Sequence, residues 1–377
     1  MGKVRFLFCA PLFLGACDLL WNPFQAPNPN YCEPGSPGCS ATGGDGATGG
    51  ADLAADPSDL SDAGPSPDLS CNPGPASPWV ADTSPPGSAA IALSGVASSG
   101  AGDLWVVGPT SYAAHRVGTT WNTITLAATI TTLGRLVYAP KQAQAMAVAG
   151  SSAGGNIVYL NKTTAPTPDL VTVAPQTVNG LWVSAAPEST PYFIGSAGSL
   201  QSFANGITWT DAGSTPPPRI SAFTGFGMGA TTTLWAASAT DNLITAYSQS
   251  TNSWRTLTSG TSSFTGIFVT VAGGVSLVGR NGVIMTAPAA VPPVGPLTPA
   301  ASPVTTNLAD VSGTADGKHL FAIGAGGTVL HWESVCRRWI AEQSPTTQGL
   351  NSVFVSDAEN TVWAVGNFGT VLHRAIP

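Results

Sequence analysis

Apolar positions follow one short pattern that recurs seven times between residues 104 and 366: an apolar strand ending in glycine or serine, a turn, and a second apolar strand. In chain order the copies are LWVVG (104–108), AMAVAG (145–150), YFIG (192–195), LWAAS (234–238), SLVG (276–279), LFAIG (320–324) and VWAVG (362–366). Their last residues are 42, 45, 43, 41, 45 and 42 positions apart. A period in the low forties, with strand patterns and no helical periodicity, is typical of β-propeller blades.

The last copy gives the order of strands within a blade. Residues 350–355, 361–366 and 369–373 form three successive strand patterns, and the chain stops at Pro377, where the other copies continue into an outermost strand. Trp79 lies ahead of the first copy in a similar outer-strand context, and the outer strands of four copies carry Trp121, Trp209, Trp254 and Trp339. We therefore predict an all-β, seven-bladed propeller of four-stranded blades, in which the N-terminal strand at Trp79 completes blade seven and removes a free sheet edge.

Composition fits this fold and excludes some functions. Only 9% of the 377 residues are charged, while 44 are glycine and 32 are proline, which suits short strands joined by tight turns. The formal net charge is −7, and no Lys or Arg occurs between Arg5 and Arg116. Nucleic-acid binding requires clustered basic side chains, so we expect no nucleic-acid partner.

The first 16 residues have the organisation of an export signal. Lys3 and Arg5 precede an apolar run, residues 6–16, that is shorter than the roughly 20 residues a membrane-spanning helix needs. The run ends in Leu-Gly-Ala-Cys at residues 14–17, which resembles the lipobox of bacterial lipoproteins. This resemblance implies that Cys17 carries a lipid and attaches the protein to a membrane. The alternative is an ordinary secretory signal cut near Ala16.

Residues 17–75 differ in composition from the propeller, which we expect to occupy residues 76–377. They contain Gly, Ala, Pro and Asp, few aromatic or β-branched side chains, and no positive charge. Such a segment cannot bury enough apolar surface to offset the entropy of ordering it, so we predict a disordered acidic tether. The lipobox-like motif and the tether together predict a lipid-anchored protein of the cell envelope. The anchor would lie in the outer membrane or at the periplasmic face of the inner membrane.

Four cysteines remain after the signal and the lipidation site: Cys32, Cys39, Cys71 and Cys336. Export to an oxidising compartment favours disulfides between them, and four cysteines allow three pairings. The turn-rich residues 33–38 can bring Cys32 and Cys39 together, which leaves Cys71 to pair with Cys336. Free thiols or a metal site are the alternatives, although no C-x-x-C motif is present.

Two motifs relate the repeats to known propellers. Residues 202–209, SFANGITW, resemble the Asp-box of BNR-repeat and sialidase-type propellers, with Ala204 at the position of the aspartate. Residues 363–372 and 323–330 are similar to the strand–turn–strand unit of photosystem II assembly factor-like propellers. In both families these motifs build turns, so the resemblance implies the fold and no catalytic activity.

Catalytic and metal-binding patterns are sparse. The arginines are scattered, and no Tyr–Glu pair or pair of carboxylates suited to glycoside hydrolysis is apparent. His115, His331 and His373 each follow the last residue of a repeat copy by seven positions. Because blades diverge outward, we expect these side chains to pack between neighbouring blades or to lie partly exposed on their strands, and not to converge on a metal. We expect His319 to be solvated in a turn. We predict no enzymatic activity, metal or cofactor.

The remaining candidates lie in the loops between second and third strands and between blades, on one face of the propeller. These binding-face candidates are Tyr112, Asn156, Arg219, Asp241, Asn242, Arg280, Asn281, Asn367 and Phe368. Their amide, aromatic and arginine side chains suit a contact with protein or glycan, although Asn is also a common turn residue. The sequence thus favours a monomeric, non-enzymatic protein-binding or assembly module. A carbohydrate-active or glycan-binding propeller is the alternative.

Overall fold

The computed structural model divides into two units, Met1–Gly64 and Pro65–Pro377, and every described residue belongs to the second. The described ranges are 77–100, 102–126, 130–140, 143–151, 154–160, 169–174, 178–184, 189–195, 200–202, 210–211, 220–227, 231–238, 243–258, 263–287 and 297–377. The predicted signal, Cys17, the tether, Cys32, Cys39 and Cys71 therefore lie outside the described residues. Within the described ranges, no helix has the length and apolar character needed to cross a membrane.

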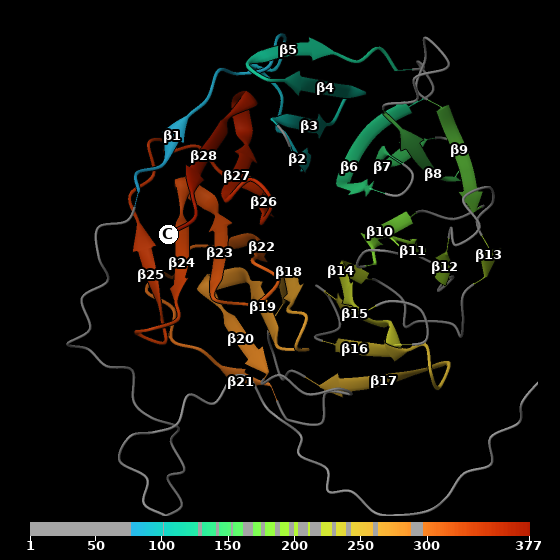
Figure 1. Cartoon of the computed structure of the whole chain (residues 1–377), viewed down its shortest axis with the longest axis vertical. Coiled ribbons are helices and arrows are strands. Elements are labelled where there is room, and N and C mark those ends of the chain that lie inside the picture. The colour runs from blue at the N-terminus through green and yellow to red at the C-terminus, as the bar shows by residue number, and fades with distance from the viewer. Residues whose placement is uncertain are drawn as a thin grey trace, which may run out of the picture. The chain divides into compact units, whose positions relative to one another are not determined.

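The described chain folds into seven antiparallel sheets of four strands each, arranged around a common centre (Figure 1). This confirms the predicted seven-bladed propeller. Blades one to three contain β2 (Gly95–Gly100), β3 (Asp103–Gly108), β4 (Tyr112–Val117), β5 (Thr120–Thr123); β6 (Ile130–Ala139), β7 (Gln144–Ser151), β8 (Gly154–Tyr159), β9 (Asp169–Ala174); and β10 (Val178–Val183), β11 (Pro191–Gly195), β12 (Leu200–Ser202), β13 (Thr210–Asp211).

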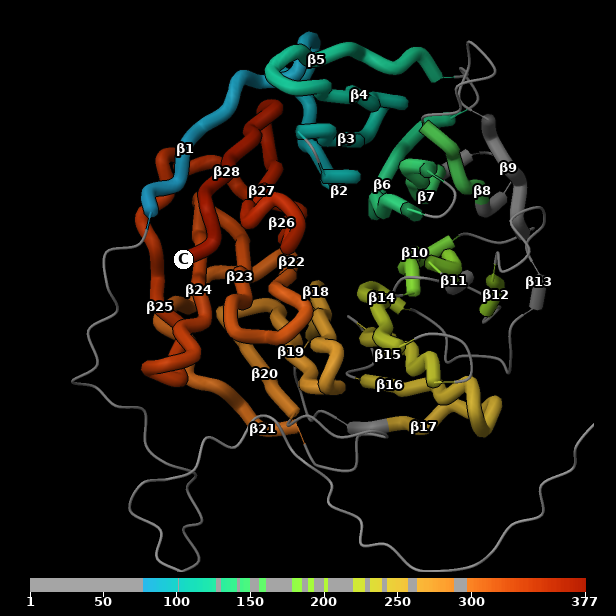
Figure 2. The backbone as a smooth tube through the Cα atoms, in the orientation of Figure 1, coloured from blue at the N-terminus to red at the C-terminus, as the bar shows by residue number. Residues whose placement is uncertain are grey.

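Blades four to seven continue the same order around the ring, as the chain trace shows (Figure 2). They contain β14 (Ile220–Phe226), β15 (Thr233–Ser238), β16 (Leu243–Ser248), β17 (Ser253–Thr258); β18 (Phe264–Val269), β19 (Val275–Gly279), β20 (Ile284–Ala287), β21 (Thr298–Pro299); β22 (Leu308–Gly313), β23 (His319–Gly324), β24 (Val329–Glu333), β25 (Arg338–Glu342); and β26 (Leu350–Ser356), β27 (Thr361–Gly366), β28 (Val371–Ala375) with β1 (Val80–Ala81). Short 3-10 turns η3 (Arg280–Gly282), η4 (Ala325–Gly327) and η5 (Asn367–Gly369) join second to third strands in blades five to seven.

Ring closure depends on β1, which pairs with β28 at the outer edge of blade seven. Val80 lies opposite His373 and Ala81 opposite Leu372. Trp79, directly before β1, is 5% exposed and packs in one apolar cluster with Phe321 of blade six and Leu372 of blade seven. The predicted N-terminal latch is therefore confirmed: a strand from the start of the propeller completes the last blade.

The glycines that end the second strands are required by close backbone approach. In blades five, six and seven they are Gly279, Gly324 and Gly366, and all three have extended backbone. A Cβ atom at any of them would overlap the carbonyl oxygen of the residue that precedes the inner strand of the same blade. The next residue donates its N–H to that oxygen, as Asn367 does to Gly349 at 2.9 Å. Because glycine lacks a Cβ atom, the end of the second strand can approach the start of the inner strand closely. This requirement explains why glycine recurs with the blade period.

Candidate functional site

The sequence-predicted binding face is divided between different parts of the propeller. Arg280 and Asn281 are exposed in η3 of blade five, whereas Asn367 and Phe368 lie in η5 of blade seven. Tyr112 begins β4 of blade one. Asn156 lies within β8 and is 1% exposed, so it is not part of an exposed loop. Arg219, Asp241 and Asn242 lie outside the described residues.

Phe368 has a left-handed backbone, with φ of 57°, and is 61% exposed. Asn281 and Gly326 occupy the corresponding central position of η3 and η4, with φ of 57° and 66°. Asn and Gly tolerate this conformation, but a bulky aromatic residue rarely adopts it. The N–H of Thr370 closes the turn on the carbonyl of Asn367 at 3.2 Å, and the N–H of Gly369 donates to the carbonyl of Ile91 at 2.8 Å. The turn therefore presents an apolar ring to solvent at a backbone cost, a combination that marks candidate functional positions.

The structure brings Tyr112 and the η5 turn against the same N-terminal segment, residues 85–93. The Tyr112 hydroxyl donates to the carbonyl of Pro86 at 2.9 Å. Asn351 Nδ2 donates both to the Asn367 side-chain oxygen at 3.0 Å and to the carbonyl of Leu93 at 2.9 Å. We call Tyr112, Asn351, Asn367 and Phe368 the blade-seven rim.

The seven inner strands β2, β6, β10, β14, β18, β22 and β26 line a central cavity of about 350 Å³. Its lining includes Val271, Ala315 and Asp357, which follow the ends of β18, β22 and β26, so the cavity opens at the face of the hairpin loops between first and second strands. The blade-seven rim lies at the opposite face, because η5 follows Gly366 and Gly366 pairs with Leu350 at the start of β26.

Arg135 of blade two spans this cavity. Its guanidinium Nη1 lies 3.4 Å from Asp310 Oδ1 of blade six, and Nη2 donates to the carbonyl of Thr265 at 3.1 Å. The carbonyls of Leu133 and Leu308 each accept a side-chain hydroxyl from the preceding blade, so these two leucines correspond. Arg135 and Asp310 each lie two residues after the corresponding leucine. The pKa of Asp310 is raised above its ordinary value because of burial. The charge of Arg135 and hydrogen bonds from Val353, Val311 and Ser352 lower the pKa, but by less than burial raises it.

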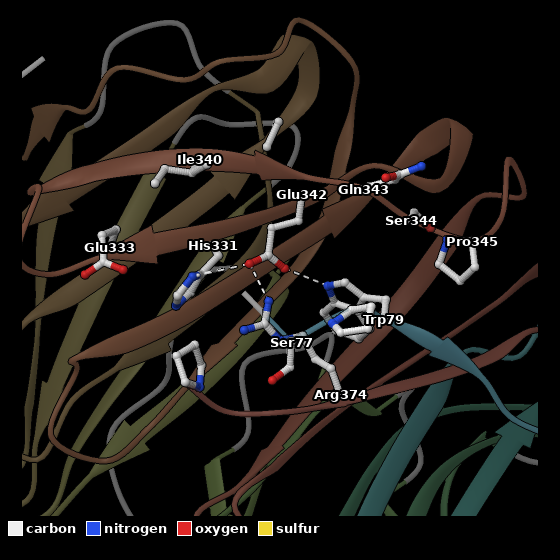
Figure 3. Close-up of a pocket in the computed structure, with 13 residues that line it drawn as sticks. Ser77, Trp79, His331, Glu333, Ile340, Glu342, Gln343, Ser344, Pro345 and Arg374 are labelled. Carbon is white, nitrogen blue, oxygen red and sulfur yellow. Dashed lines mark hydrogen bonds and ion pairs between the residues drawn. The ribbon is translucent and has the colours of Figure 1, made fainter. Parts of the chain in front are cut away.

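A second pocket, of about 650 Å³, lies where blade six meets the latch (Figure 3). At its centre is Glu342 at the end of β25. Trp79 Nε1 donates to Glu342 Oε2 at 2.6 Å, His331 Nδ1 lies 3.4 Å from Oε1, and Arg374 Nη1 forms an ion pair with the same oxygen. Figure 3 shows the three side chains converging on the carboxylate. We call Trp79, His331, Glu342 and Arg374 the closure cluster.

The closure cluster is buried and electrostatically coupled. The Arg374 side chain is fully buried, and that of Glu342 is 9% exposed. Burial alone would raise the pKa of Glu342, but hydrogen bonds from His331, Arg374 and Trp79, together with the charge of Arg374, outweigh it and hold the pKa below its ordinary value. The carboxylate therefore remains ionised and joins three elements: blade six, blade seven and the N-terminal strand.

The three histidines share no common partner, and each packs on an aromatic side chain of its own blade, whereas packing between blades was expected. His115 stacks on Trp105, His331 stacks on Phe321, and His373 packs against Trp363. His319 was expected in solvent, but it stacks on His331 with 3.2 Å between Nδ1 and Nε2. That expectation was wrong because His319 begins β23, beside the third strand of its own blade. Among the described residues, no group of three or more His, Cys, Asp or Glu side chains could hold a metal ion.

Two glutamates in the described part of the propeller each join neighbouring parts of the ring. Glu359 accepts hydrogen bonds from Gly102 N–H at 2.7 Å and Ser98 Oγ at 2.9 Å, which joins a blade-seven loop to blade one. Glu342 joins blade six to the latch. Glu188 lies outside the described residues.

Sequence reasoning missed Glu342 and Arg135 as important residues. A signal for Glu342 exists in retrospect: Trp339-Ile-Ala-Glu342 and Trp79-Val-Ala-Asp82 are parallel outer-strand motifs. Arg135 could have been found as the charged residue at a repeat position that is glycine in blades one, three and five, at Gly95, Gly180 and Gly266.

No family model and no curated protein matches this chain. Solved structures do. A structure described as YCF48 bound to D1 peptide is 13% identical, with a TM-score of 0.61 over 81% of this chain and 99% of that chain. YCF48 from Cyanidioschyzon merolae is 14% identical, with a TM-score of 0.62 over 79% and 98%. A catalytically inactive virginiamycin B lyase from Staphylococcus aureus with quinupristin is 12% identical, with a TM-score of 0.62 over 78% and 98%. At these identities the likeness is one of fold.

Proposed function

We propose that this protein is a non-enzymatic propeller that binds a segment of another envelope protein through the blade-seven rim. The observation that carries the proposal is Phe368, a 61% exposed aromatic ring held in a left-handed turn. A rigidly presented aromatic ring is a typical anchor in protein recognition, because it buries a large apolar area at low conformational cost.

The surroundings of Phe368 suit a peptide backbone. Asn367 and Asn351 supply amide groups, and Tyr112 supplies an aromatic side chain on the adjoining blade. The hydrogen bond from Asn351 to Asn367, together with bonds from Asn351 and Tyr112 to carbonyls of residues 85–93, fixes these side chains before a partner arrives, which lowers the entropic cost of binding. The fold is also shared with YCF48, one structure of which is described as bound to D1 peptide.

We further propose that the protein acts at the cell envelope, attached through a lipid on Cys17 and held off the membrane by residues 17–75. The support is the residue 14–17 motif that resembles a lipobox and the acidic, Gly- and Pro-rich composition that follows it. The acyl chains would anchor the protein stably where two or more are attached.

The proposal is tested with a photo-crosslinking amino acid at position 368, and at Val117 as a control. Val117 is 52% exposed in the third strand of blade one and is no part of the rim. Crosslinking in cells should give one dominant protein adduct from position 368 that the Val117 variant does not give, and Asn367→Asp should reduce it. The same adducts from both positions, or a glycan array that binds the wild-type domain but not Phe368→Ser, would contradict protein recognition by the rim.

A further inference from the structure

The central cavity, which we call the funnel, is lined mainly by apolar side chains. Trp182, Phe268 and Phe354 come from blades three, five and seven, line the cavity and are half-buried. Val271 stands at the mouth and is 63% exposed, although it is a branched apolar side chain. A concave site with aromatic walls and a few polar groups is the usual form of a small-ligand pocket, and the volume of about 350 Å³ lies within the usual range of roughly 300–1,000 Å³.

The charged groups of the funnel are arranged along its depth. Arg135 of β6 and Asp310 of β22 lie at the inner end of the funnel. Asp357, which follows β26, lies at the mouth. Asp357 accepts the N–H of Ala315 at 3.0 Å and is exposed. Asp357 therefore repels an anionic group at the mouth, and Arg135 is the cation of the lining that can pair with such a group, with its charge partly offset by Asp310.

Arg135 is held by one hydrogen bond of ordinary length, to the carbonyl of Thr265 at 3.1 Å, and by two longer contacts. Its contact with Asp310 is 3.4 Å long, its second carbonyl contact, with Ser221, is 3.5 Å, and its side chain is 31% exposed. A well-formed guanidinium–carboxylate pair is shorter, about 2.7–2.9 Å, and often bidentate.

Asp310 does not depend on Arg135 for its hydrogen bonds. Its oxygens accept from Val311 N–H at 3.0 Å, Val353 N–H at 3.2 Å and Ser352 Oγ at 3.3 Å. Asp310 can therefore keep these partners while Arg135 turns its planar donors toward an anion in the funnel.

We propose that the funnel binds a small amphipathic carboxylate, with its apolar body against Trp182, Phe268 and Phe354 and its carboxylate on Arg135. This site is separate from the proposed rim, because it opens at the opposite face of the propeller. The same chemistry is offered by a free aliphatic or aromatic acid and by the C-terminal residue of an apolar peptide.

The probes are three eight-carbon molecules that differ in their head groups: octanoate, octanol and octylammonium. Calorimetric titration of the wild-type protein should show saturable binding of octanoate, with octanol at least about tenfold weaker and octylammonium weaker still. A tenfold difference corresponds to about 1.4 kcal/mol. A tetrapeptide ending in leucine separates the two sources of the carboxylate. If the peptide with a free C-terminus binds at least as tightly as octanoate, and the amidated peptide binds more weakly, the ligand is the end of a peptide.

Two variants test the position of the ligand. Arg135→Gln should remove the preference for octanoate over octanol. Val271→Asp adds an anion at the mouth, on an exposed side chain whose change leaves the fold intact, and should weaken octanoate at least about tenfold. Val335→Asp, at an 81% exposed hairpin tip outside the funnel, is the matched control and should bind as wild type. Absence of saturable octanoate binding, equal affinity for octanol, or unchanged binding by Val271→Asp would overturn the proposal.

Discussion

Arg116 and Arg374 occupy the same position on the third strands of consecutive blades and make the same two contacts with the preceding blade. Arg374 of blade seven lies over the ring of Phe321, at 5.4 Å, and pairs with Glu342. Arg116 of blade one lies over the ring of Trp363, at 5.2 Å, and pairs with Asp82 at 3.2 Å. In each case the acid follows an outer-strand tryptophan by three residues.

These two contacts flank blade seven, whose outer strand comes from the other end of the propeller domain. A blade completed in this way depends on side-chain contacts at its seams, because only two residue pairs join β1 to β28. Asp82 lies one residue after β1, and Glu342 accepts the indole N–H of Trp79, just before it. Both arginine contacts therefore involve an acid that belongs to the N-terminal strand or is hydrogen-bonded to it.

Removing the Glu342 charge should destabilise the ring. Glu342→Gln leaves the fully buried Arg374 guanidinium without its counter-charge, and loss of one partner of a buried pair costs about 3–5 kcal/mol. Chemical denaturation measures the free energy of unfolding. Glu333→Gln, on the same blade but with a partly exposed side chain, is the control and should change it by less than about 1 kcal/mol. Equal effects of the two substitutions would show that the closure cluster contributes little to stability.

Removal of the latch should be more damaging than removal of the predicted tether. A protein that lacks residues 18–70 keeps Trp79, β1 and Asp82. One that lacks residues 18–85 exposes the edge of β28 and loses a buried aromatic side chain worth roughly 1.5–3 kcal/mol. It also loses the hydrogen bond from Trp79 to Glu342 and the ion pair between Asp82 and Arg116. The longer deletion should therefore melt markedly lower or aggregate. Similar melting temperatures for both would show that blade seven is stable with three strands.

Stability should fall as pH drops below about 6.5, in part because of His319. Burial, followed by the neighbouring His331, holds the pKa of His319 below its ordinary value of 6.5, so the folded state favours the neutral ring. The unfolded chain then binds more protons just below pH 6.5, and the free energy of unfolding decreases with falling pH. Replacing His319 with Gln should reduce this slope, as measured by denaturation between pH 5 and pH 8, and an unchanged slope would contradict the prediction.

A second loss of stability should occur at lower pH because the pKa of Glu342 lies below its ordinary value of 4.5. A carboxyl group with a depressed folded pKa stabilises the protein above its unfolded pKa, and this contribution is lost as pH falls through the folded value. Asp310 acts in the opposite direction, since its raised pKa favours the folded state when it is protonated. In a plot of the free energy of unfolding against pH, the decrease below pH 4.5 should therefore disappear in Glu342→Gln. The same decrease should remain in Asp310→Asn.

The sequence predicted the fold more completely than the site because the two depend on different information. Blade number, strand order and the Trp79 latch follow from a repeat whose period can be read along the chain. Glu342, by contrast, matters because Trp79 lies 263 positions away and still contacts it, and no local pattern reveals such a contact. Phe368 was identified from its loop, and its left-handed backbone recurs at the corresponding residues of η3 and η4, but the hydrogen bond from Gly369 to Ile91 that joins this turn to residues 85–93 is visible only in the folded chain.

A disulfide between Cys71 and Cys336 remains a prediction that would reinforce the latch. Cys336 is 1% exposed, in the turn between β24 and β25 of blade six, and Cys71 precedes Trp79 by eight residues. A covalent link here would hold the N-terminal strand beside the closure cluster. Peptide mapping without reduction should recover a Cys71–Cys336 pair and a separate Cys32–Cys39 pair. Recovery of either cysteine alkylated, or of another pairing, would contradict it.

Lipidation of Cys17 can be tested separately from every structural feature of the propeller, because residue 17 and the tether lie outside the described domain. Cys17→Ser removes the thiol that would carry the acyl chains, while the apolar run that directs export stays intact. The variant should leave the membrane fraction and appear in a soluble envelope fraction, or accumulate with its signal uncut, and it should incorporate no labelled fatty acid. Ser40→Ala, within the predicted tether, is the control and should fractionate as wild type. If Cys17→Ser is still processed and still sediments with membranes, the anchor is not a lipid on this cysteine, and attachment must come from the propeller's partner.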